Sequence, residues 1–397
     1  MIIKPKMRGF ICTTSHPVGC AKAVEEQINF VKSKDKFDGP KNVLVIGGST
    51  GYGLASRISA TYGSGAKTIG VFFEKEPANN RTGSAGWYNT AALEKFAHAD
   101  GYYARSINGD AFSNAIKTKT IDLIKKDLGK IDLIVYSLAS PKRTHPLSGE
   151  VYSSALKPIN QSFTSKTVDP LKKEIKEISI EPASDDEIKN TIAVMGGEDW
   201  NMWIDLLGQE NLLADGVVTL AYDYIGPNLT HSIYKNGTIG KAKENLLNTA
   251  LILNNKLKKL NGKALLSVNK ALVTQASAAI PVVPLYISLL YKIMKEKNIH
   301  EGCIDQINRL FKDKIYNNID LDLDDQGRVR MDDLEMRSDV QDKIIELWGS
   351  INSNNLDELT DIDGYINDFH QLFGFNFKDV DYSKDISPEV NIPSLSD

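Results

Sequence analysis

Hydrophobic residues in the first third of the chain are gathered into short continuous runs. Residues 42–47, 68–73 and 131–138 are each almost entirely apolar, which is typical of strands that are buried on both faces of a sheet. Between these runs, apolar residues recur every three or four positions, the spacing of an amphipathic helix, in residues 54–62, 90–98 and 115–128. Buried strands that alternate with helices predict an α/β fold with a doubly wound parallel sheet.

The second half of the chain has a more helical pattern. Residues 241–260 carry apolar side chains at helical spacing, and Gly262 follows where a helix-ending glycine is expected. Residues 264–273 predict a further buried strand. The polar tail beyond about residue 379 is expected to lie on the surface. Two more segments predict outer helices, namely residues 301–316 and 339–348.

Composition adds few constraints on function. The 397 residues are 42% hydrophobic and 25% charged, as in globular proteins, and the net charge of −4 disfavours a nucleic-acid binder. The most apolar stretch, residues 271–294, contains Gln275, Pro281 and Pro284, which argues against a membrane span. The three cysteines and the scattered histidines show neither a disulfide framework nor metal-ligand spacing, so a cytoplasmic chain without a metal site is expected.

A glycine-rich turn, GGSTGYG at residues 47–53, follows the first strand directly. Glycines let the backbone turn sharply and let a pyrophosphate approach, while the next helix offers its free N–H groups and positive dipole end to that anion. The GxxxGxG spacing is the variant that short-chain dehydrogenases and reductases use. Placed between an apolar strand and an apolar helix, the turn predicts a dinucleotide site; the alternative is a purely structural turn.

Three further positions are expected to contact the dinucleotide. Glu74 follows the second strand, where a carboxylate accepts hydrogen bonds from the adenosine ribose and repels the extra phosphate of NADPH. NADH is therefore the predicted cofactor, although Lys75 would attract that phosphate. Residues 110–111 fall where such folds recognise the adenine. Residues 138–139 end the third strand, where the backbone lines the ribose and nicotinamide side.

Tyr234 and Lys243 are the candidate catalytic pair, since a reductase of this class needs an acid near the substrate oxygen and a cation near the nicotinamide ribose. On one continuous helix, an offset of nine residues would turn the two away from a common face. Gly237 and Gly240 interrupt the helical pattern. Tyr234 is therefore expected before a helix and Lys243 in its first turn, with both directed into one cleft that Tyr224 also lines.

Other interpretations remain open. Tyr291 and Lys295 have the Tyr-x3-Lys spacing of carbonyl reductases, but they follow the last core strand and are interpreted as a surface pair. A dinucleotide-binding protein without catalytic activity would need only the glycine turn. Residues 322–333 partly match a calcium loop, yet Arg328 and Arg330 would lie beside the ion, so a hairpin turn into a strand is predicted instead.

Taken together, these motifs resemble those of the trans-2-enoyl-CoA reductases and the V-type enoyl-acyl-carrier-protein reductases. The resemblance implies a monomeric, enlarged short-chain-reductase fold, Rossmann-like with extra helices. Such enzymes use NADH to reduce the C2=C3 bond of enoyl thioesters on coenzyme A or acyl carrier protein. The resemblance spans nearly the whole chain and rests on MIIKPKMRGFICTTSHPVGC, GGSTGYGLASR, GSAGWYNTAA, DLIVYSLASPKR, GGEDW, the pair Tyr234 and Lys243, and GRVRMDDLEM.

The same resemblance assigns roles to single residues. Tyr234 would be the catalytic acid, Lys243 a cofactor contact that lowers the pKa of the tyrosine, and Tyr224 a substrate contact. The chain would be one domain with a cofactor-binding half (about 1–150), an insertion over the substrate (about 140–223) and a catalytic and C-terminal part (about 224–397). The residues expected to line NADH are Gly48, Ser49, Thr50, Gly51, Tyr52, Gly53, Phe73, Glu74, Asp110, Ala111, Leu138, Ala139, Lys243, Leu272, Val273 and Thr274.

Overall fold

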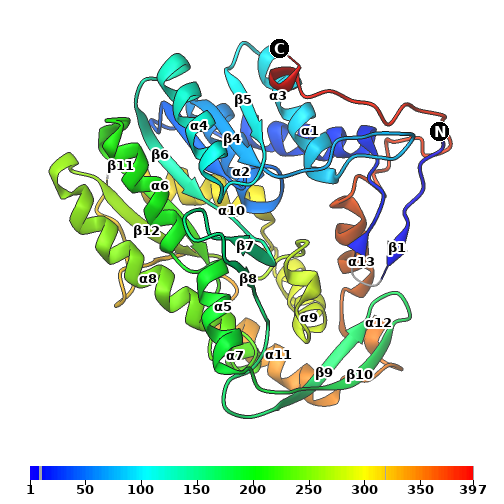
Figure 1. Cartoon of the computed structure of the whole chain (residues 1–397). Coiled ribbons are helices and arrows are strands. Elements are labelled where there is room, and N and C mark those ends of the chain that lie inside the picture. Colours follow the sequence, from blue (N-terminus) through cyan, green and yellow to red (C-terminus); the bar gives the residue numbers. More distant parts are fainter. Residues whose placement is uncertain (9–10, 318, 397) are drawn as a thin grey trace.

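The computed structural model describes residues 1–8, 11–317 and 319–396. Its centre is one parallel sheet (Figure 1). The seven strands of this sheet are β3 (Asn42–Ile46), β4 (Lys67–Phe72), β5 (Ala104–Asn108), β6 (Ile131–Tyr136), β11 (Leu213–Asp223), β12 (Lys263–Val268) and β13 (Val329–Arg330). Their order across the sheet is β13-β12-β11-β6-β3-β4-β5. From β3 the chain proceeds outward through β4 and β5 and then returns to β6 on the other side of β3. This topology confirms the predicted doubly wound fold.

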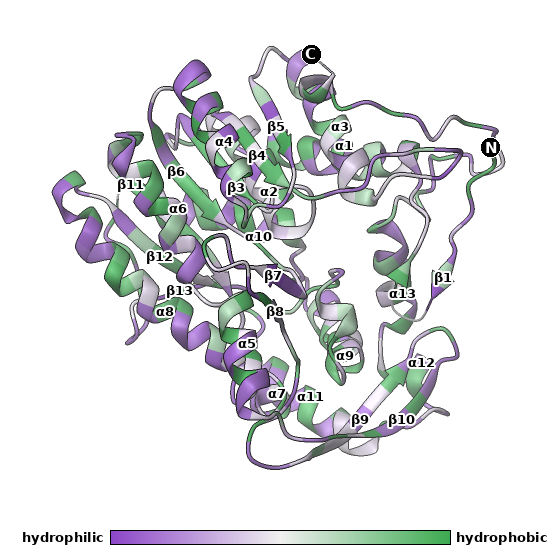
Figure 2. Ribbon diagram, viewed as in Figure 1, coloured by the Kyte–Doolittle hydropathy of each residue, from purple (hydrophilic) through white to green (hydrophobic). Residues whose placement is uncertain are grey.

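The side chains of the central strands alternate between two apolar layers. In β3, Val43 and Val45 face one layer, whereas Leu44 and Ile46 face the other. The first layer is covered by α1 (Pro17–Lys32), α2 (Gly51–Ser59), α3 (Ala85–Ala99) and α10 (Cys303–Arg309). The second is covered by α4 (Asn114–Asp127), α6 (Glu198–Gln209) and α8 (Thr238–Leu257). Coverage of both faces explains the continuous apolar runs, which colour β3, β4 and β6 mostly green in Figure 2.

The segments after β12 build another apolar region beside the sheet. The central helix of this region, α9 (Val283–Glu296), is buried along most of its length. It is packed by α11 (Ser338–Ser350) and α13 (Ile362–Gln371), with the short α12 (Leu356–Leu359) beside them. The most apolar stretch of the sequence is thus enclosed by other helices. Within the described ranges, no helix is both long and apolar enough to cross a bilayer.

The segment between β6 and β11 leaves the sheet and carries two antiparallel hairpins. They are β7 (Lys142–Thr144) with β8 (Val151–Ser153), and β9 (Phe163–Asp169) with β10 (Glu174–Ile180). The second hairpin lies against the C-terminal helices, because Lys166 donates from Nζ to the Trp348 carbonyl at 2.9 Å and Lys173 pairs with Asp357 at 2.8 Å. The helix α5 (Asp185–Met195) then leads back towards α6.

Two predicted strand features are wrong. The strand β12 ends at Val268 rather than at residue 273, because the chain leaves the sheet there to form an irregular segment at its edge. The turn at residues 325–327 does lead into β13, but β13 pairs in parallel with β12 instead of closing a hairpin. A strand that follows a turn joins whichever sheet edge lies next to it, and the local sequence does not specify that partner.

The C-terminal tail lies on the surface, as predicted, and parts of it are packed against the sheet domain. Ile392 is fully buried. Trp87 and Tyr88 of α3 donate side-chain hydrogen bonds to carbonyl groups of the tail, each at 2.7 Å, and Ser394 Oγ accepts the Ser106 N–H at 2.9 Å. The tail is therefore a packed part of the dinucleotide-binding half, held by backbone contacts that a polar composition does not reveal.

Candidate active site

Apart from Lys243 in α8, the segments that the sequence predicts to bind a dinucleotide or a substrate follow strands of the sheet. Because parallel strands end at one edge, these segments meet at that edge, on both sides of the switch point between β3 and β6. They are residues 47–53 after β3, 73–74 after β4, 110–111 after β5, 138–139 after β6, Tyr224 after β11, and 272–274 after β12.

The glycine turn is packed too tightly for side chains on its inner face. A Cβ at Gly53 would lie 2.0 Å from the Gly47 carbonyl oxygen, and a Cβ at Gly47 would lie 2.2 Å from the Ser137 carbonyl oxygen. Gly47 also has a φ of +89°, which favours glycine. On the outer face, a Cβ at Gly51 would meet nothing within 4 Å, and α2 begins there with its free N–H groups. The turn therefore fits a pyrophosphate.

Other residues of the turn contact neighbouring edge segments. Gly48 is buried, and Thr50 directly precedes α2. The Tyr52 hydroxyl donates to the Lys270 carbonyl at 3.0 Å, and Ser49 Oγ donates to the Glu74 carboxylate at 2.7 Å. The turn is thereby connected to the segments that follow β4 and β12.

Glu74 is fixed in place by its backbone and its side chain. Its N–H donates to the Asn108 side-chain oxygen at 2.8 Å, and its carbonyl accepts from the Asn108 amide at 2.9 Å. Gly86 of α3 makes room for the carboxylate, since a Cβ there would lie 2.1 Å from Glu74 Oε1. Glu74 lines a groove of about 790 Å³, and the neighbouring ring of Phe73 is exposed. A ribose placed in this groove would meet the carboxylate.

A buried ion pair fixes the loop at residues 110–112. Lys117 of α4 donates from Nζ to the carbonyl oxygens of Ala111 at 3.0 Å and Phe112 at 2.9 Å. The same amine donates to Asp199 Oδ1 at 2.6 Å, and Asp110 Oδ1 accepts the Phe112 N–H at 3.0 Å. Asp199 belongs to the GGEDW motif, which therefore positions the predicted adenine loop. Sequence reasoning missed this role because the partners are far apart along the chain.

Tyr234 lies between α7 (Asn228–His231) and α8, as predicted. Its carbonyl accepts the N–H groups of Gly237 at 3.1 Å and Gly240 at 3.0 Å. A Cβ at Gly240 would lie 1.8 Å from the Lys235 carbonyl oxygen, so only a glycine allows this close turn. Lys243 falls in the second turn of α8 rather than in the predicted first turn, because α8 already begins at Thr238.

Tyr234 and Tyr224 meet edge to face, with ring centroids 4.8 Å apart and an interplanar angle of 86°. Tyr234 is 9% exposed, and no hydrogen-bond partner for its hydroxyl lies among the described residues. Burial raises the pKa of Tyr234, and the carboxylate of Asp223 raises it further. The predicted lowering of this pKa by Lys243 is therefore wrong in direction. The hydroxyl keeps its proton at neutral pH and is able to donate it.

Lys243 connects α8 to the end of β11. Its Nζ donates to the Tyr222 carbonyl at 2.7 Å. Burial lowers the pKa of Lys243, while the Asp223 carboxylate acts in the opposite direction. The same carboxylate raises the pKa of Tyr234. The charge of Asp223 therefore acts on both the lysine and the tyrosine.

The segment after β12 forms a closed turn at the same edge. Ser277 Oγ donates to the Leu272 carbonyl at 2.6 Å and accepts the Thr274 N–H at 2.9 Å. The Val273 N–H donates to the Tyr291 hydroxyl at 3.1 Å. The backbone of this turn is thereby fixed where the nicotinamide side of a dinucleotide is expected.

Tyr291 and Lys295 are not the surface pair that the sequence suggests. Tyr291 is 2% exposed, and its hydroxyl supports the turn just described. Lys295 is exposed and pairs with Asp361 at 2.6 Å. The apolar packing of α9 buries one member of the pair and leaves the other at the surface, so the two do not form a second catalytic site.

Several acidic groups of the segment that partly matches a calcium loop are paired with basic side chains. Asp324 accepts from Arg328 Nε at 2.9 Å, and Asp333 accepts from Arg309 at 2.9 Å. Among the residues that the structure describes, no group of three His, Cys, Asp or Glu side chains is placed to hold a metal ion.

Two family models together match most of the chain. Residues 81–316 match the trans-2-enoyl-CoA reductase catalytic region, and residues 2–79 match the NAD(P)H binding domain of trans-2-enoyl-CoA reductase. Over the full length of both chains, the sequence is 61% identical to trans-2-enoyl-CoA reductase [NADH] of Ruminiclostridium cellulolyticum and 60% identical to enoyl-[acyl-carrier-protein] reductase [NADH] of Flavobacterium johnsoniae.

Solved structures agree with these matches. The trans-2-enoyl-CoA reductase of Clostridium acetobutulicum in complex with NADH superimposes with a TM-score of 0.96, at 48% identity and 98% coverage of each chain. The Treponema denticola enzyme in complex with NAD gives a TM-score of 0.94 at 49% identity, with 97% of this chain and 98% of that chain covered.

A third family model, described as an enoyl reductase FAD binding domain, matches residues 323–386. The interior of this segment is filled by its own side chains, including Tyr365, Phe369 and Phe373. The cavity beside Tyr365 and Phe369 has a volume of about 20 Å³, whereas cofactor-sized ligands occupy pockets of roughly 300–1,000 Å³. These residues do not fit a flavin, and we assign no step to one.

Proposed function

The chain belongs to the trans-2-enoyl-CoA reductase family, and we propose that Tyr234, Tyr224 and Lys243 form the site at which it acts. The protein is an NADH-dependent oxidoreductase that reduces the C2=C3 double bond of trans-2-enoyl thioesters to the saturated acyl thioester. One observation carries the site assignment: the edge-to-face contact of Tyr224 and Tyr234 at the sheet edge where the glycine turn also lies.

Bound NADH supplies a hydride to C3 of the substrate. As that bond forms, the electrons of the double bond move towards the thioester carbonyl, and negative charge develops on its oxygen. The Tyr234 hydroxyl, which burial keeps protonated, donates a hydrogen bond to that oxygen where the transition state needs it. The resulting enolate gains a proton at C2, and we assign that proton to the Tyr234 hydroxyl. Tyr224 restricts the ring of Tyr234, and Lys243 contacts the nicotinamide ribose.

We assign the NADH contacts to the edge segments. The N-terminus of α2 and residues 48–53 take the pyrophosphate, the Glu74 carboxylate takes the adenosine ribose, and residues 110–111 take the adenine. Residues 138–139 and 272–274 line the nicotinamide side. These assignments rest on the open outer face of the turn and on the common edge of the strands.

Glu74→Ser is expected to relax the preference for NADH over NADPH. The carboxylate and the extra phosphate of NADPH repel each other by roughly 1–4 kcal/mol, or about ten- to a thousand-fold in affinity. Removing the carboxylate also frees Lys75 to pair with the phosphate. The measurement is the ratio of kcat/KM with NADH to that with NADPH. Glu76→Ser removes an exposed acid from the same groove and should leave the ratio unchanged. An unchanged ratio in Glu74→Ser would exclude a ribose contact.

Gly86→Ala should shift the same ratio in the same direction. The new Cβ would lie 2.1 Å from Glu74 Oε1 and 2.8 Å from the Ser49 Cβ, so the carboxylate must move away from the ribose position. Gly349→Ala is the matched control, because Gly349 also lies in a helix and a Cβ there would meet nothing within 4 Å. If the ratio in Gly86→Ala equals the wild-type ratio, the position of the Glu74 carboxylate does not determine the preference for NADH over NADPH.

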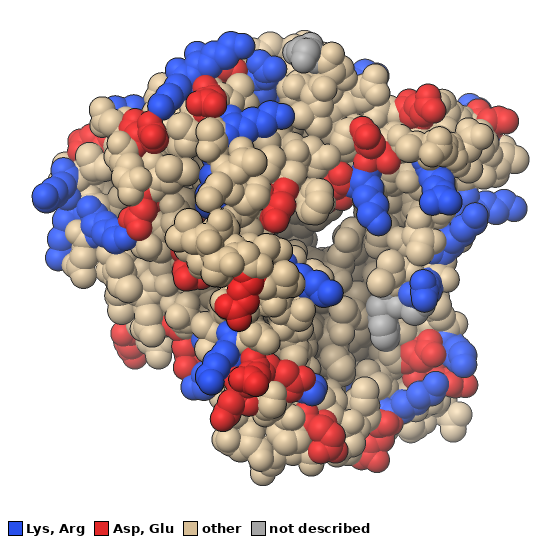
Figure 3. All heavy atoms as spheres, viewed as in Figure 1, with Lys and Arg blue, Asp and Glu red and all other residues tan. Residues whose placement is uncertain are grey.

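The acyl carrier, the assembly state and the location in the cell belong to the same proposal. We infer that a coenzyme A or acyl carrier protein thioester binds at the hollow at the centre of the face in Figure 3, where both basic and acidic side chains lie at the rim. Both carriers bear phosphate, which the basic side chains would attract. Residues of about 140–223 would cover the substrate, in one domain whose halves meet at the sheet edge. The free thiols of Cys12, Cys20 and Cys303 suit a monomer in the reducing cytoplasm.

The direct test is reduction of crotonyl-CoA by the purified protein, followed as loss of NADH absorbance. Rapid NADH oxidation that yields butyryl-CoA is expected. A simple ketone or aldehyde offered in place of crotonyl-CoA should not be reduced. The rival carbonyl-reductase mechanism through Tyr291 is disfavoured because Tyr291 is 2% exposed and lies in the buried helix α9. Reduction of carbonyl compounds without reduction of crotonyl-CoA would overturn the proposed function.

A further inference from the structure

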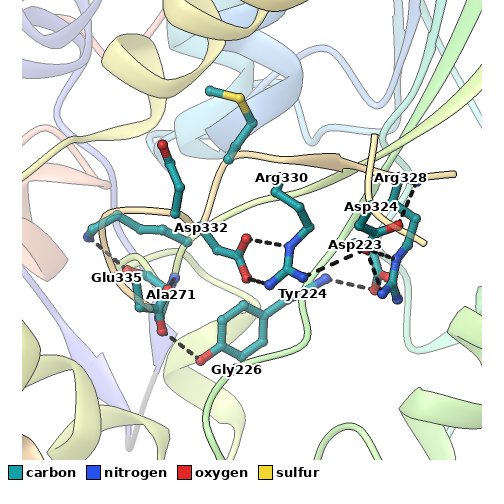
Figure 4. Close-up of polar contacts among 12 residues, drawn as sticks. Asp223, Tyr224, Gly226, Ala271, Asp324, Arg328, Arg330, Asp332 and Glu335 are labelled. Carbon is teal, nitrogen blue, oxygen red and sulfur yellow. Dashed lines mark hydrogen bonds and ion pairs between the residues drawn. The ribbon is translucent and has the colours of Figure 1, made fainter. Parts of the chain in front are cut away.

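A single buried carboxylate, Glu335, contacts both walls of the proposed site. It lies in the turn after β13 and is fully buried. Its Oε1 accepts from the hydroxyls of Tyr286 at 2.6 Å and Tyr224 at 3.2 Å, and its Oε2 accepts the Ala271 N–H at 2.7 Å. Figure 4 shows the carboxylate between the Tyr224 hydroxyl and the backbone at Ala271. Tyr224 belongs to the substrate side, and Ala271 begins the segment on the nicotinamide side.

Glu335 is itself held rigidly. Gln341 of α11 donates from Nε2 to the Glu335 carbonyl at 2.7 Å and to the Tyr286 hydroxyl at 3.1 Å. Burial raises the pKa of the Glu335 carboxyl, while the hydrogen bond from Tyr286 and the positive charge of the buried Lys270 amine act in the opposite direction. That amine donates to the Ala271 carbonyl at 3.0 Å. A carboxylate with this support is well suited to hold other groups in place.

All three groups on the carboxyl oxygens donate hydrogen bonds, and that pattern requires an acceptor on both oxygens. A carboxylate meets this requirement, whereas a glutamine amide does not. Its NH₂ would either face the Ala271 N–H, donor against donor, or face the two tyrosines and reverse the direction of their hydroxyl hydrogen bonds. The arrangement therefore uses the ability of both carboxyl oxygens to accept hydrogen bonds.

We propose that Glu335 is a positioning residue that aligns the Tyr224–Tyr234 pair with the nicotinamide-side segment for hydride transfer. The proposal rests on the proposed function. Hydride transfer requires the substrate carbon and the cofactor at close distance and in line, so a shift of about 1 Å between the two walls is costly. The Tyr224 hydroxyl packs closely against the backbone of Gly226, where a Cβ would lie 2.6 Å from its oxygen. This role also accounts for the segment that matches a flavin-binding model, since that segment supplies Glu335.

The test is Glu335→Gln, measured by kcat and KM for crotonyl-CoA, by NADH affinity and by thermal unfolding. We expect kcat to fall about ten- to a hundred-fold, with NADH affinity kept within about threefold because the hydrogen-bond partners of Glu335 that the structure describes do not include the residues proposed to hold the pyrophosphate and the adenosine ribose. Glu94→Gln is the matched control. Glu94 is equally buried, and its oxygens accept from Ser394 of the C-terminal tail at 2.9 and 2.8 Å rather than from Tyr224 or Ala271. This variant reports what the loss of a buried carboxylate costs in stability alone, and its kcat should stay at the wild-type level.

A double-mutant cycle with Tyr224→Phe shows whether Glu335 acts through this tyrosine. If it does, the double variant should lose less kcat than the product of the two single losses. Full additivity, or a wild-type kcat in Glu335→Gln, would overturn the proposal. Should Glu335→Gln not fold, Tyr286→Phe removes one donor from the same oxygen and should lower kcat without changing NADH affinity; an unchanged kcat would then overturn it. A wild-type protein that is inactive with crotonyl-CoA would overturn the proposed function, and this proposal with it.

Discussion

Tyr234→Phe is expected to lower the turnover of crotonyl-CoA by roughly two to four decades, the usual contribution of a positioned acid. The hydroxyl is the group that meets the charge developing on the thioester oxygen, and phenylalanine offers nothing in its place. The fold should persist, because the ring keeps its edge-to-face contact with Tyr224. No described residue hydrogen-bonds to the hydroxyl, so its removal leaves no buried partner unpaired.

This expectation is checked by kcat at saturating NADH and crotonyl-CoA, together with NADH affinity and the temperature of thermal unfolding. Tyr365→Phe provides the comparison. Tyr365 of α13 is also a buried tyrosine whose hydroxyl lacks a partner, but it lies in the C-terminal helical region and should keep wild-type turnover. A Tyr234→Phe enzyme with near-normal turnover would remove this tyrosine from the chemistry.

The elements that could be predicted from the sequence are those whose structure depends on residues that lie close together in the chain. The run NVLVI of β3 is apolar because both of its faces are covered, and this is visible in the sequence itself. The glycine turn is specified by close backbone approaches within residues 47–53 and to the end of β6. Tyr234 could be placed before a helix because Gly237 and Gly240 leave a recognisable break.

The parts that could not be predicted depend on contacts between residues far apart in the chain. Glu335 and Tyr224 are separated by 111 positions, and Lys117 and Asp199 by 82. No spacing rule relates such residues, and an isolated Glu-Met at the end of GRVRMDDLEM resembles a surface turn. The direction of the Tyr234 pKa shift was missed for the same reason, because it follows from burial, which only the assembled fold determines.

Lys243→Ala is the variant in which activity should fall without a matching loss of stability. A buried amine has its pKa lowered because the fold disfavours the charged form. This costs stability in full at pH values below the lowered pKa of the folded state, and the cost is gone once the pH exceeds the pKa of lysine in the unfolded chain. Alanine removes this cost at neutral pH, but it also removes the hydrogen bond to the Tyr222 carbonyl and the positive charge beside the buried Asp223 carboxyl. These effects oppose each other, so thermal unfolding at pH 7 is expected near the wild-type temperature.

Activity should fall in the same variant. A hydrogen bond from a charged amine to the nicotinamide ribose contributes about 1.5–3 kcal/mol, so kcat/KM should drop roughly ten- to a hundred-fold, and the Kd for NADH should rise. Lys241→Ala is the matched control on the same helix, since Lys241 is exposed and pairs with Glu244 at 2.8 Å; its kinetics should not change. If Lys243→Ala changed only the unfolding temperature and left NADH affinity and turnover intact, Lys243 would have no contact with the cofactor, and its spacing from Tyr234 would be a coincidence.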